Sequence, residues 1–281
     1  MVKTIPFFLI LISVVLLTYA DTIDENVAPL CFSVCGAKVF VEDSMVIDIP
    51  SLRDDECVWV IQTQKDRILV FTLISESFED VQDYLTIHDG FRKDSPILQI
   101  ENQKEYEASN KDLHPAIYTT SSVATLRSRG TRASVLQLKI QKAVECPFNL
   151  GANTACGRVV DETSCYCANF ALRNRADQMI FCYNNYMKLV SLESYDEEQK
   201  IVSAWNVNSW SSLTDQQGEG NWIWETTGAP MIPGYVNWNS GEPSGAGLFG
   251  EEDCMAFPEF EGGWNDVDCY VEKAGICELH P

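Results

Sequence analysis

Eleven cysteines in 281 residues limit the folds that are open to this chain. None of them forms the paired Cys-x-x-Cys units of structural zinc sites, so disulfide bonds are their expected use. Because disulfides persist in oxidising compartments, we expect an exported protein. The chain also carries 41 acidic against 20 basic residues, a formal charge of -21, which argues against nucleic acid or anionic membranes as partners.

The first residues, 1–20, have the layout of a cleavable signal peptide. A basic Lys3 precedes an apolar run at residues 5–17, and small residues near Ala20 stand where signal peptidase cuts. The run is too short to cross a membrane, and no later segment is long and apolar enough to anchor the chain. We therefore predict a secreted, extracellular protein with no membrane anchor.

The length suits two domains, each able to bury its own core. In residues 31–144, apolar and polar side chains alternate, most clearly at residues 136–141, while residues 68–74 are apolar on both faces like an inner strand. Helical periodicity is absent, and turn-forming residues recur at strand-like intervals. We predict an all-β sandwich here and a second domain over residues 146–281.

The second domain combines helix and strand signals. Ser194 to Glu197 form a capping box, followed by Ile201, Val202 and Trp205 on one helical face. Another helix is expected around residues 176–187, with an inward face made of Met179, Ile180, Cys182 and Tyr183. Short segments rich in Trp and Gly follow, so we predict an α+β domain whose tryptophans mostly fill the core, Trp238 and Trp264 being the exceptions to test.

The segment from Trp238 to Asp266 carries the most distinctive chemistry. Carboxylate and amide oxygens recur there among glycines and prolines, in Trp238-Asn239-Ser240-Gly241-Glu242-Pro243-Ser244, Glu252-Asp253-Cys254 and Gly263-Trp264-Asn265-Asp266. Such oxygens on a loop between cysteines suit a hard cation, above all calcium. The alternative is a surface turn with solvated acidic residues, but three motifs in order favour the metal site.

These motifs resemble the sugar-binding loop of C-type lectin domains, which carries Glu-Pro-Asn or Gln-Pro-Asp, then Glu-Asp-Cys, then Trp-Asn-Asp. The resemblance implies calcium ligands at Glu242, Glu252, Asn265 and Asp266, with Ser244 as the fifth. It also implies a cis peptide bond before Pro243 and a carbohydrate contacting Glu242, Ser244, Glu252 and Asn265.

Ser244 departs from the family pattern, because mannose-type members have an asparagine there. An asparagine supplies a carbonyl oxygen to the metal and an N–H donor to the sugar, whereas serine offers one shorter hydroxyl. Glu242 still accepts and Ser244 can still donate, which favours a mannose-type over a galactose-type preference. The resemblance implies an auxiliary calcium site as well, at Asp215, Glu219, Asp253 and a share of Glu252, although these could instead form a solvated acidic loop.

The amino-terminal half resembles a CUB domain through Cys35-Gly36, Cys57-Val58-Trp59-Val60-Ile61 and Asp83-Tyr84-Leu85-Thr86-Ile87-His88-Asp89-Gly90. CUB domains usually have a second disulfide, and Asp80 stands in place of its first cysteine. Ser75 and Arg129 stand about where calcium-binding members have acidic residues. The resemblance therefore implies a CUB-like sandwich that holds no calcium of its own.

The same resemblances imply four disulfides, at Cys35–Cys57, Cys146–Cys156, Cys182–Cys277 and Cys254–Cys269. For the second of these pairs, Cys165 also fits the position of the later cysteine. The remaining three, Cys31, Cys165 and Cys167, cannot all pair within one chain. One of them is then free or links two chains into a disulfide-linked oligomer.

The leading hypothesis is a secreted, calcium-dependent protein that binds glycans and, as in many secreted relatives, serves innate immune recognition. The alternative is an extracellular protein-binding module in which Ser244 marks a decayed sugar site. An enzyme is not expected, because the chain has no nucleophile elbow and no phosphate loop. A zinc site is not expected either, since the histidines lie outside any ligand motif, at His88, His114 and His280.

Overall fold

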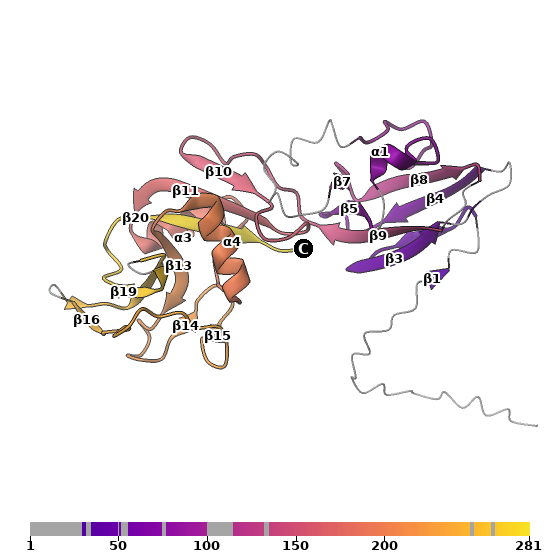
Figure 1. The fold of residues 1–281 in the computed structure, drawn as a ribbon. Helices are drawn as coiled ribbons and strands as arrows, with labels where there is room; N and C mark the ends of the chain where they lie inside the picture. Colours follow the sequence, from indigo (N-terminus) through magenta and orange to yellow (C-terminus); the bar gives the residue numbers. More distant parts are fainter. Residues whose placement is uncertain are drawn as a thin grey trace, which may run out of the picture.

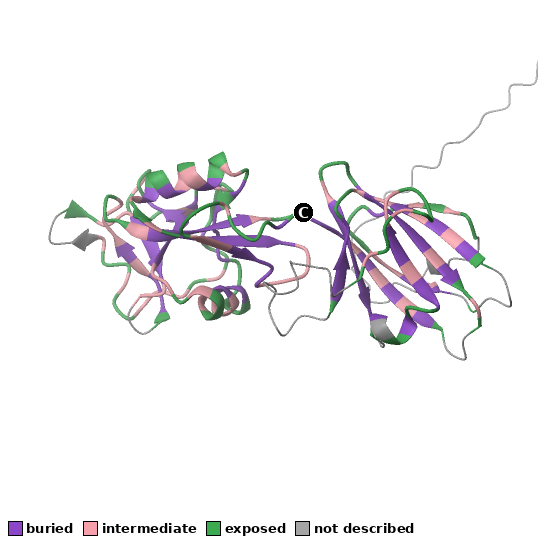
Figure 2. Cartoon of the chain, turned by 90° about the horizontal axis from the view of Figure 1, so that it is seen from above, coloured by how far each residue is buried: buried purple, intermediate pink, exposed green. Residues whose placement is uncertain are grey.

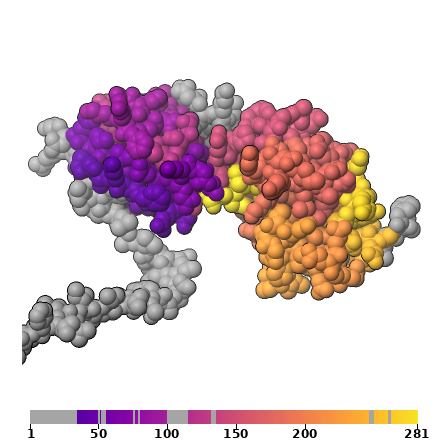
Figure 3. Space-filling model, turned by 180° about the vertical axis from the view of Figure 1, so that it is seen from behind, coloured from indigo at the N-terminus to yellow at the C-terminus, as the bar shows by residue number. Residues whose placement is uncertain are grey.

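The computed structural model describes residues 30–31, 35–49, 51, 56–74, 77–99, 115–131, 135–247, 250–259 and 262–281. These residues form two lobes, an amino-terminal and a carboxyl-terminal half, each with its own hydrophobic core (Figure 1, Figure 3). Among them, no helix has the length and apolar character needed to cross a bilayer. The predicted signal peptide, residues 1–20, lies outside the described residues.

The described residues of the amino-terminal half form two β-sheets. One sheet has the strand order β1 (Leu30–Cys31), β3 (Ser44–Ile49), β9 (Leu136–Ala143), β5 (Ile68–Leu73) and β7 (Ala116–Tyr118). The other has the order β2 (Lys38–Phe40), β4 (Glu56–Gln62), β8 (Val123–Arg129) and β6 (Leu85–Asp89). A short helix, α1 (Phe78–Val81), precedes β6.

Alternation along the strands places one face of each sheet in a shared core (Figure 2). Leu138 and Ile140 of β9 and Trp59 and Ile61 of β4 belong to the same buried cluster. Strand β5 is buried at every position, as its apolar sequence predicts. This half is therefore β-rich with two layers, while its assignment as a CUB-like sandwich, with the boundaries 31–144, stays a prediction.

The carboxyl-terminal half is an α+β structure around one mixed sheet. Its main path runs β10 (Thr154–Gly157), β11 (Cys165–Arg173), β20 (Lys273–Leu279), β13 (Ser209–Thr214), β14 (Ile223–Trp224) and β15 (Ala229–Pro230). Three further strands pair beside this path, β12 (Lys188–Leu189), β18 (Cys254–Phe257) and β19 (Asn265–Val267). A separate hairpin is formed by β16 (Ala246–Gly247) and β17 (Gly250–Glu251).

Helix α4 (Tyr195–Trp205) begins as the capping box predicts. The Ser194 hydroxyl accepts the amide N–H of Glu197 at 3.1 Å, which satisfies one of the free donors of the first turn. The Glu197 carboxylate, however, accepts the amide N–H of Glu193 at 2.7 Å instead of that of Ser194. The helix start was therefore predicted correctly, and the reciprocal bond is shifted by one residue.

Helix α3 (Arg175–Asn184) turns only part of the predicted face inward, namely Cys182 and the partly buried Met179. Cys182 is buried, but Ile180 and Tyr183 are 55% and 79% exposed, so their predicted inward orientation is wrong. The buried positions are instead Arg175 and Gln178 beside Cys182. Polar side chains can occupy this face because they find partners there; the Gln178 amide, for example, donates to the carbonyl of Lys273 at 2.8 Å.

The described residues form five disulfides, at Cys35–Cys57, Cys146–Cys165, Cys156–Cys167, Cys182–Cys277 and Cys254–Cys269. The predicted pair Cys146–Cys156 is wrong. Strands β10 and β11 run antiparallel with Cys156 opposite Cys167, so the register joins these two and leaves Cys165 for Cys146. The side chain of Cys31 lies outside the described residues, and a disulfide-linked oligomer stays a prediction.

Arg158 connects the two halves. Its guanidinium group is completely buried, donates to the carbonyl of Val144 at 2.6 Å, and lies 4.4 Å from the ring centroid of Tyr118. The amide of Val144 donates in turn to the carbonyl of Thr163 at 3.0 Å. A buried cation with carbonyl and aromatic partners thus holds the junction where β9 leads into the carboxyl-terminal half.

The end of α3 generates a stability prediction. Tyr186 has a φ of 59°, and the amide of the next residue, Met187, donates back to the carbonyl of Cys182, so Tyr186 occupies the left-handed position that glycine usually takes after a helix. Its side chain is 90% exposed and loses little contact when removed. We expect Tyr186→Gly to raise the free energy of unfolding by about 1 kcal/mol.

Urea unfolding followed by tryptophan fluorescence measures this, since six of the seven tryptophans lie between residues 205 and 264. Asn153→Gly is the matched control, because Asn153 has a φ of 61° and asparagine tolerates this region better than tyrosine. Its gain should be smaller. An unchanged or lowered stability of Tyr186→Gly would contradict the assignment of backbone strain.

Candidate functional site

The five residues predicted to hold the first calcium ion lie on the loop between Trp238 and Asp266, and the two ends of this loop pair at its base. The amide of Asn239 donates to the carbonyl of Trp264 at 2.9 Å, and the amide of Trp264 donates to the carbonyl of Asn237 at 2.8 Å. This pairing brings the turn at Glu242 to the start of β19, where Asp266 lies. The peptide bond between Glu242 and Pro243 is cis, as the resemblance implies.

Four of the predicted ligands meet at this point, and Asn265 stands next to them on β19. The Ser244 hydroxyl donates to Glu252 Oε2 at 3.3 Å. Contact with the carboxyl group of the buried Asp266, together with burial, raises the pKa of Glu242. Burial and the charge of Asp266 also raise the pKa of Glu252. Negative charges are thus crowded together, an arrangement that favours a cation.

The predicted auxiliary ligands form a second acidic group at the end of β13. Asp215 is buried, its Oδ2 accepts the amide of Gly220 at 2.8 Å, and its amide donates to the carbonyl of Asp253 at 3.2 Å. The charge of Asp215 is the main cause of the raised pKa of Glu219. Burial, followed by the charge of Asp215, raises the pKa of Asp253.

Gly245 lies between the two acidic groups. Its amide donates to Asp266 Oδ2 at 2.6 Å, and its φ is 72°. A Cβ atom at this position would stand 2.7 Å from Glu219 Oε1. The left-handed φ favours glycine here, and a Cβ would also displace the end of the Glu219 side chain. Because glycine has no side chain, this position cannot supply a side-chain ligand.

Three carboxylate oxygens of these groups are buried and have no hydrogen-bond partner among the described residues: Glu242 Oε2, Asp266 Oδ1 and Asp215 Oδ1. The contact between the Glu242 and Asp266 carboxyl groups is a hydrogen bond only when one of them is protonated. Unsatisfied buried oxygens are costly, and a cation bound between them would remove the cost. Because all the candidate ligand atoms are oxygens, the donor set fits calcium.

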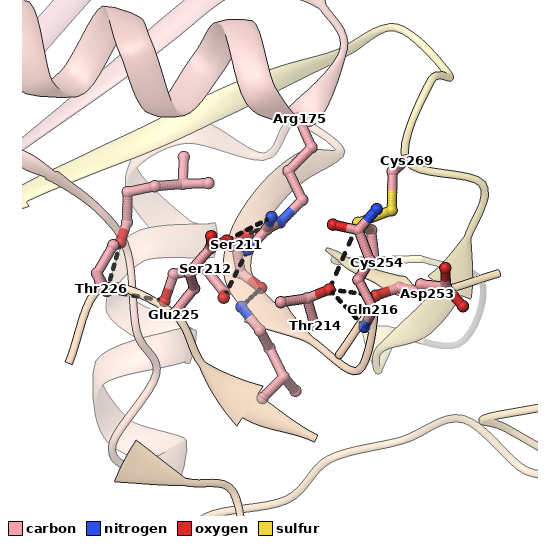
Figure 4. A network of polar contacts seen from close by, with 12 residues as sticks. Arg175, Ser211, Ser212, Thr214, Gln216, Glu225, Thr226, Asp253, Cys254 and Cys269 are labelled. Carbon is pink, nitrogen blue, oxygen red and sulfur yellow. Dashed lines mark hydrogen bonds and ion pairs between the residues drawn. A yellow bond between two sulfur atoms is a disulfide. The ribbon is translucent and has the colours of Figure 1, made fainter. Parts of the chain in front are cut away.

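A network of polar contacts joins Asp253 and the strand β13 to the surrounding structure (Figure 4). Arg175 donates to the carbonyls of Ser211 and Ser212 at 3.1 and 2.7 Å and pairs with Glu225 at 2.9 Å. The hydroxyl of Thr214 donates to the carbonyl of Asp253 at 2.7 Å. Cys254, which follows Asp253, is held by the disulfide to Cys269. The Glu252-Asp253 segment is therefore fixed in position by the bond from Thr214 and by this disulfide.

Sequence reasoning missed a third cluster, in which ligand atoms of Glu197, Glu278 and His280 lie within 4.8 Å of one another. Its groups already have internal partners. Glu197 accepts from the hydroxyl of Tyr166 at 2.8 Å and from the amide of Glu193, and Glu278 contacts His280 at 3.2 Å. No motif marks these residues in the sequence. The carboxylate oxygens of this cluster have hydrogen-bond partners, whereas three buried oxygens of the loop site have none.

The two tryptophans beside the site are buried in the core to different extents. Trp264 has 0% exposure and contacts the edges of Trp224 and Tyr235, so it is part of the core. Trp238 is partly buried and contacts Trp222 and Trp264. Stacking of a sugar on Trp264 is therefore excluded in this structure.

Comparison with known proteins matches residues 173–279 to the family model of the lectin C-type domain. CD209 antigen of Homo sapiens is 37% identical over 120 residues, which cover 41% of this chain and 28% of that protein. Asialoglycoprotein receptor 1 of Pongo abelii is 31% identical over 186 residues, covering 63% of this chain and 60% of that protein. The chain thus spans less than two thirds of the length of either relative.

Two solved structures are also similar. The human scavenger receptor C-type lectin carbohydrate-recognition domain is 30% identical, covers 42% of this chain and 92% of its own, and has a TM-score of 0.39. The cow CD23 domain, solved in the presence of GlcNAc2Man3 oligosaccharide, is 30% identical, with coverages of 42% and 88% and a TM-score of 0.38.

The relatives contradict one prediction. CD209 antigen and asialoglycoprotein receptor 1 are membrane-anchored receptors, which contradicts the prediction of a secreted protein. Such C-type lectins are non-enzymatic carbohydrate-binding proteins, and their domains are generally calcium-dependent. The loop motifs, the α+β architecture and the match of the family model agree, and residues 173–279 of this chain are a C-type lectin domain.

Proposed function

We propose that this protein binds carbohydrate through calcium held by the long loop of its lectin domain. The observation that carries the proposal is the set of buried carboxylate oxygens without partners, at Glu242, Asp266 and Asp215. Oxygens left unsatisfied beside like charges create a site that a divalent cation stabilises. Carboxylates whose oxygens all had hydrogen-bond partners would gain less from a bound cation.

The residues around the ion have distinct roles in this proposal. Glu242, Ser244, Glu252, Asn265 and Asp266 hold calcium, which when bound offers coordination positions to two vicinal sugar hydroxyls. Glu242 and Glu252 accept hydrogen bonds from these hydroxyls, while the Ser244 hydroxyl and the Asn265 amide donate to the sugar oxygens. Asp266 is buried and accepts a hydrogen bond from the amide of Gly245, so it binds the ion and does not contact the sugar.

A mannose-type preference follows from the order of acceptor and donor around Pro243. Glu242 precedes the proline as an acceptor, and Ser244 follows it with a hydroxyl directed at Glu252 Oε2. Each sugar displaces ordered water from the ion, so a single site binds weakly, and useful avidity comes from several sites acting together.

A second calcium ion is proposed at Asp215, Glu219 and Asp253, with a share of Glu252. The charge of Asp215, which helps to raise the pKa values of Glu219 and Asp253, and the partnerless Asp215 Oδ1 support it. The position of Gly245 between this group and Asp266 implies that the two ions stabilise the same stretch of loop.

Retention on immobilised mannan tests the function. We expect the purified protein to bind the matrix in calcium and to elute with a chelator, and mannose to compete better than galactose. Glu242→Gln should reduce retention at least about tenfold, because it removes one charged ligand that also contacts the sugar. Folded protein that flows through, or binding that survives chelation, would contradict the mechanism and favour the protein-recognition alternative.

The same variant should change stability with opposite signs in the two metal states. Without calcium, Glu242→Gln removes repulsion from Asp266 and raises the free energy of unfolding by on the order of 1 kcal/mol. With calcium, the wild-type protein gains stability through binding, and the variant gains less. Thermal unfolding with and without calcium measures both effects. A variant that is less stable than wild type in chelator would argue against carboxylate crowding.

Ser244→Asn is expected to strengthen sugar binding about tenfold. Asparagine adds a carbonyl oxygen for the metal and an N–H donor for the sugar, where serine has one hydroxyl. The measurement is the concentration of mannose that releases the protein from mannan. Ser240→Asn, at an exposed serine of the same loop, is the control and should change nothing. Equal affinity of Ser244→Asn and wild type would show that the serine already does both tasks.

A further inference from the structure

Glu198 is a buried carboxylate that the proposed binding mechanism does not use. It lies on α4 with 0% exposure, away from the candidate ligands. Its oxygens accept three side-chain hydrogen bonds, from the Tyr235 hydroxyl at 2.7 Å, the Asn237 amide at 3.1 Å and the Trp264 indole at 2.9 Å. All three donors belong to the two segments that form the base of the long loop.

The buried carboxylate of Glu198 is stabilised by its three hydrogen-bond donors. Burial raises the pKa of Glu198, and the hydrogen bonds from Tyr235, Trp264 and Asn237 oppose that shift. A buried carboxylate needs such donors, since an unsatisfied one would cost several kcal/mol. The loop base is therefore tied to α4 by hydrogen bonds that would be costly to break.

A short chain of contacts leads from Glu198 to the candidate ligands. The carbonyl of Asn237 accepts the amide of Trp264, the carbonyl of Trp264 accepts the amide of Asn239, and the carbonyl of Asn239 accepts the amide of Glu242 at 3.0 Å. On the other segment, Trp264 is followed directly by Asn265 and Asp266. One carboxylate on α4 thus holds both sides of the site.

We propose that Glu198 is a positioning residue that keeps the loop base closed, so that Glu242 and Asp266 converge before calcium arrives. The inference rests on the proposed calcium-dependent function and identifies a residue that controls it from outside the ligand set. Repulsion among the ligand carboxylates tends to spread the loop, and the bonds of Glu198 to both segments oppose that spreading. Preorganisation of this kind raises affinity because less ordering remains to be done on binding.

The chain offers a matched control in the residue before it. Glu197 lies on the same helix, is also buried, and also has a pKa raised first of all by burial. Its carboxylate, however, accepts from the Tyr166 hydroxyl on β11 and the amide of Glu193, and none of its partners is on the loop. Glu197→Gln therefore disturbs the packing of α4 without loosening the loop base.

Amide hydrogen exchange of the full chain in chelator is the first measurement. In Glu198→Gln, we expect the amides of Asn239, Glu242 and Trp264 to exchange at least about tenfold faster than in wild type, while Glu197→Gln leaves them unchanged. This readout needs no calcium, so it judges the positioning role even if the proposed function fails. Unchanged loop exchange in Glu198→Gln, or equal acceleration in both variants, would overturn the inference.

The second measurement is the calcium concentration that gives half-maximal retention on mannan. It should rise about 10–100-fold in Glu198→Gln, as for other groups that orient metal ligands, and stay unchanged in Glu197→Gln. A wild-type calcium requirement in Glu198→Gln contradicts the proposal. If Glu198→Gln does not fold, Tyr235→Phe replaces it, because it removes one donor only and should shift both readouts in the same direction by less.

Discussion

Repulsion between carboxylates is the constraint on which the arrangement of the lectin domain depends. Glu242, Glu252 and Asp266 converge on one side of Gly245, and Asp215 and Glu219 lie on the other. Nearby negative charges help to raise the pKa values of Glu219 and Glu252, and carboxylates this close would separate on a flexible loop. The surrounding structure therefore has to hold the loop in place as well as carry the ligands.

Several independent contacts do this. Thr214 fixes the carbonyl of Asp253, the Cys254–Cys269 disulfide closes the segment that follows, and Glu198 ties the loop base to α4. Arg175 joins α3 to the strand beneath, through the carbonyls of Ser211 and Ser212. Thr214, Cys254, Glu198 and Arg175 lie on strands or helices, which suits a site that must keep its shape without an ion.

Several features of this domain could be predicted because they depend on local chemistry. The Glu-Pro-Ser turn, the Glu-Asp-Cys segment and the Trp-Asn-Asp segment stand out as oxygen-rich motifs, and the structure brings their residues together. The Ser194 cap at the start of α4 is also local, since a serine hydroxyl reaches the amide three residues later. Such signals need only the order of residues along one segment.

Other features depend on which segments meet. The register of β10 on β11 decides that Cys156 pairs with Cys167, whereas the family resemblance implied a pair between Cys146 and Cys156. Gln178 faces inward, where a periodic pattern favoured Ile180, because the carbonyls of Ala171 on β11 and Lys273 on β20 accept from its amide.

The sequence by itself determined the chemistry of the loop and the starts of its helices, because these follow from residue types at short range. Only the tertiary structure decided that Glu198 lies beneath the loop and Glu197 against β11, since two adjacent carboxylates on one helix point to different neighbours. The same holds for the surroundings of Gly245, which Glu219 and Asp266 approach from segments far apart in the chain.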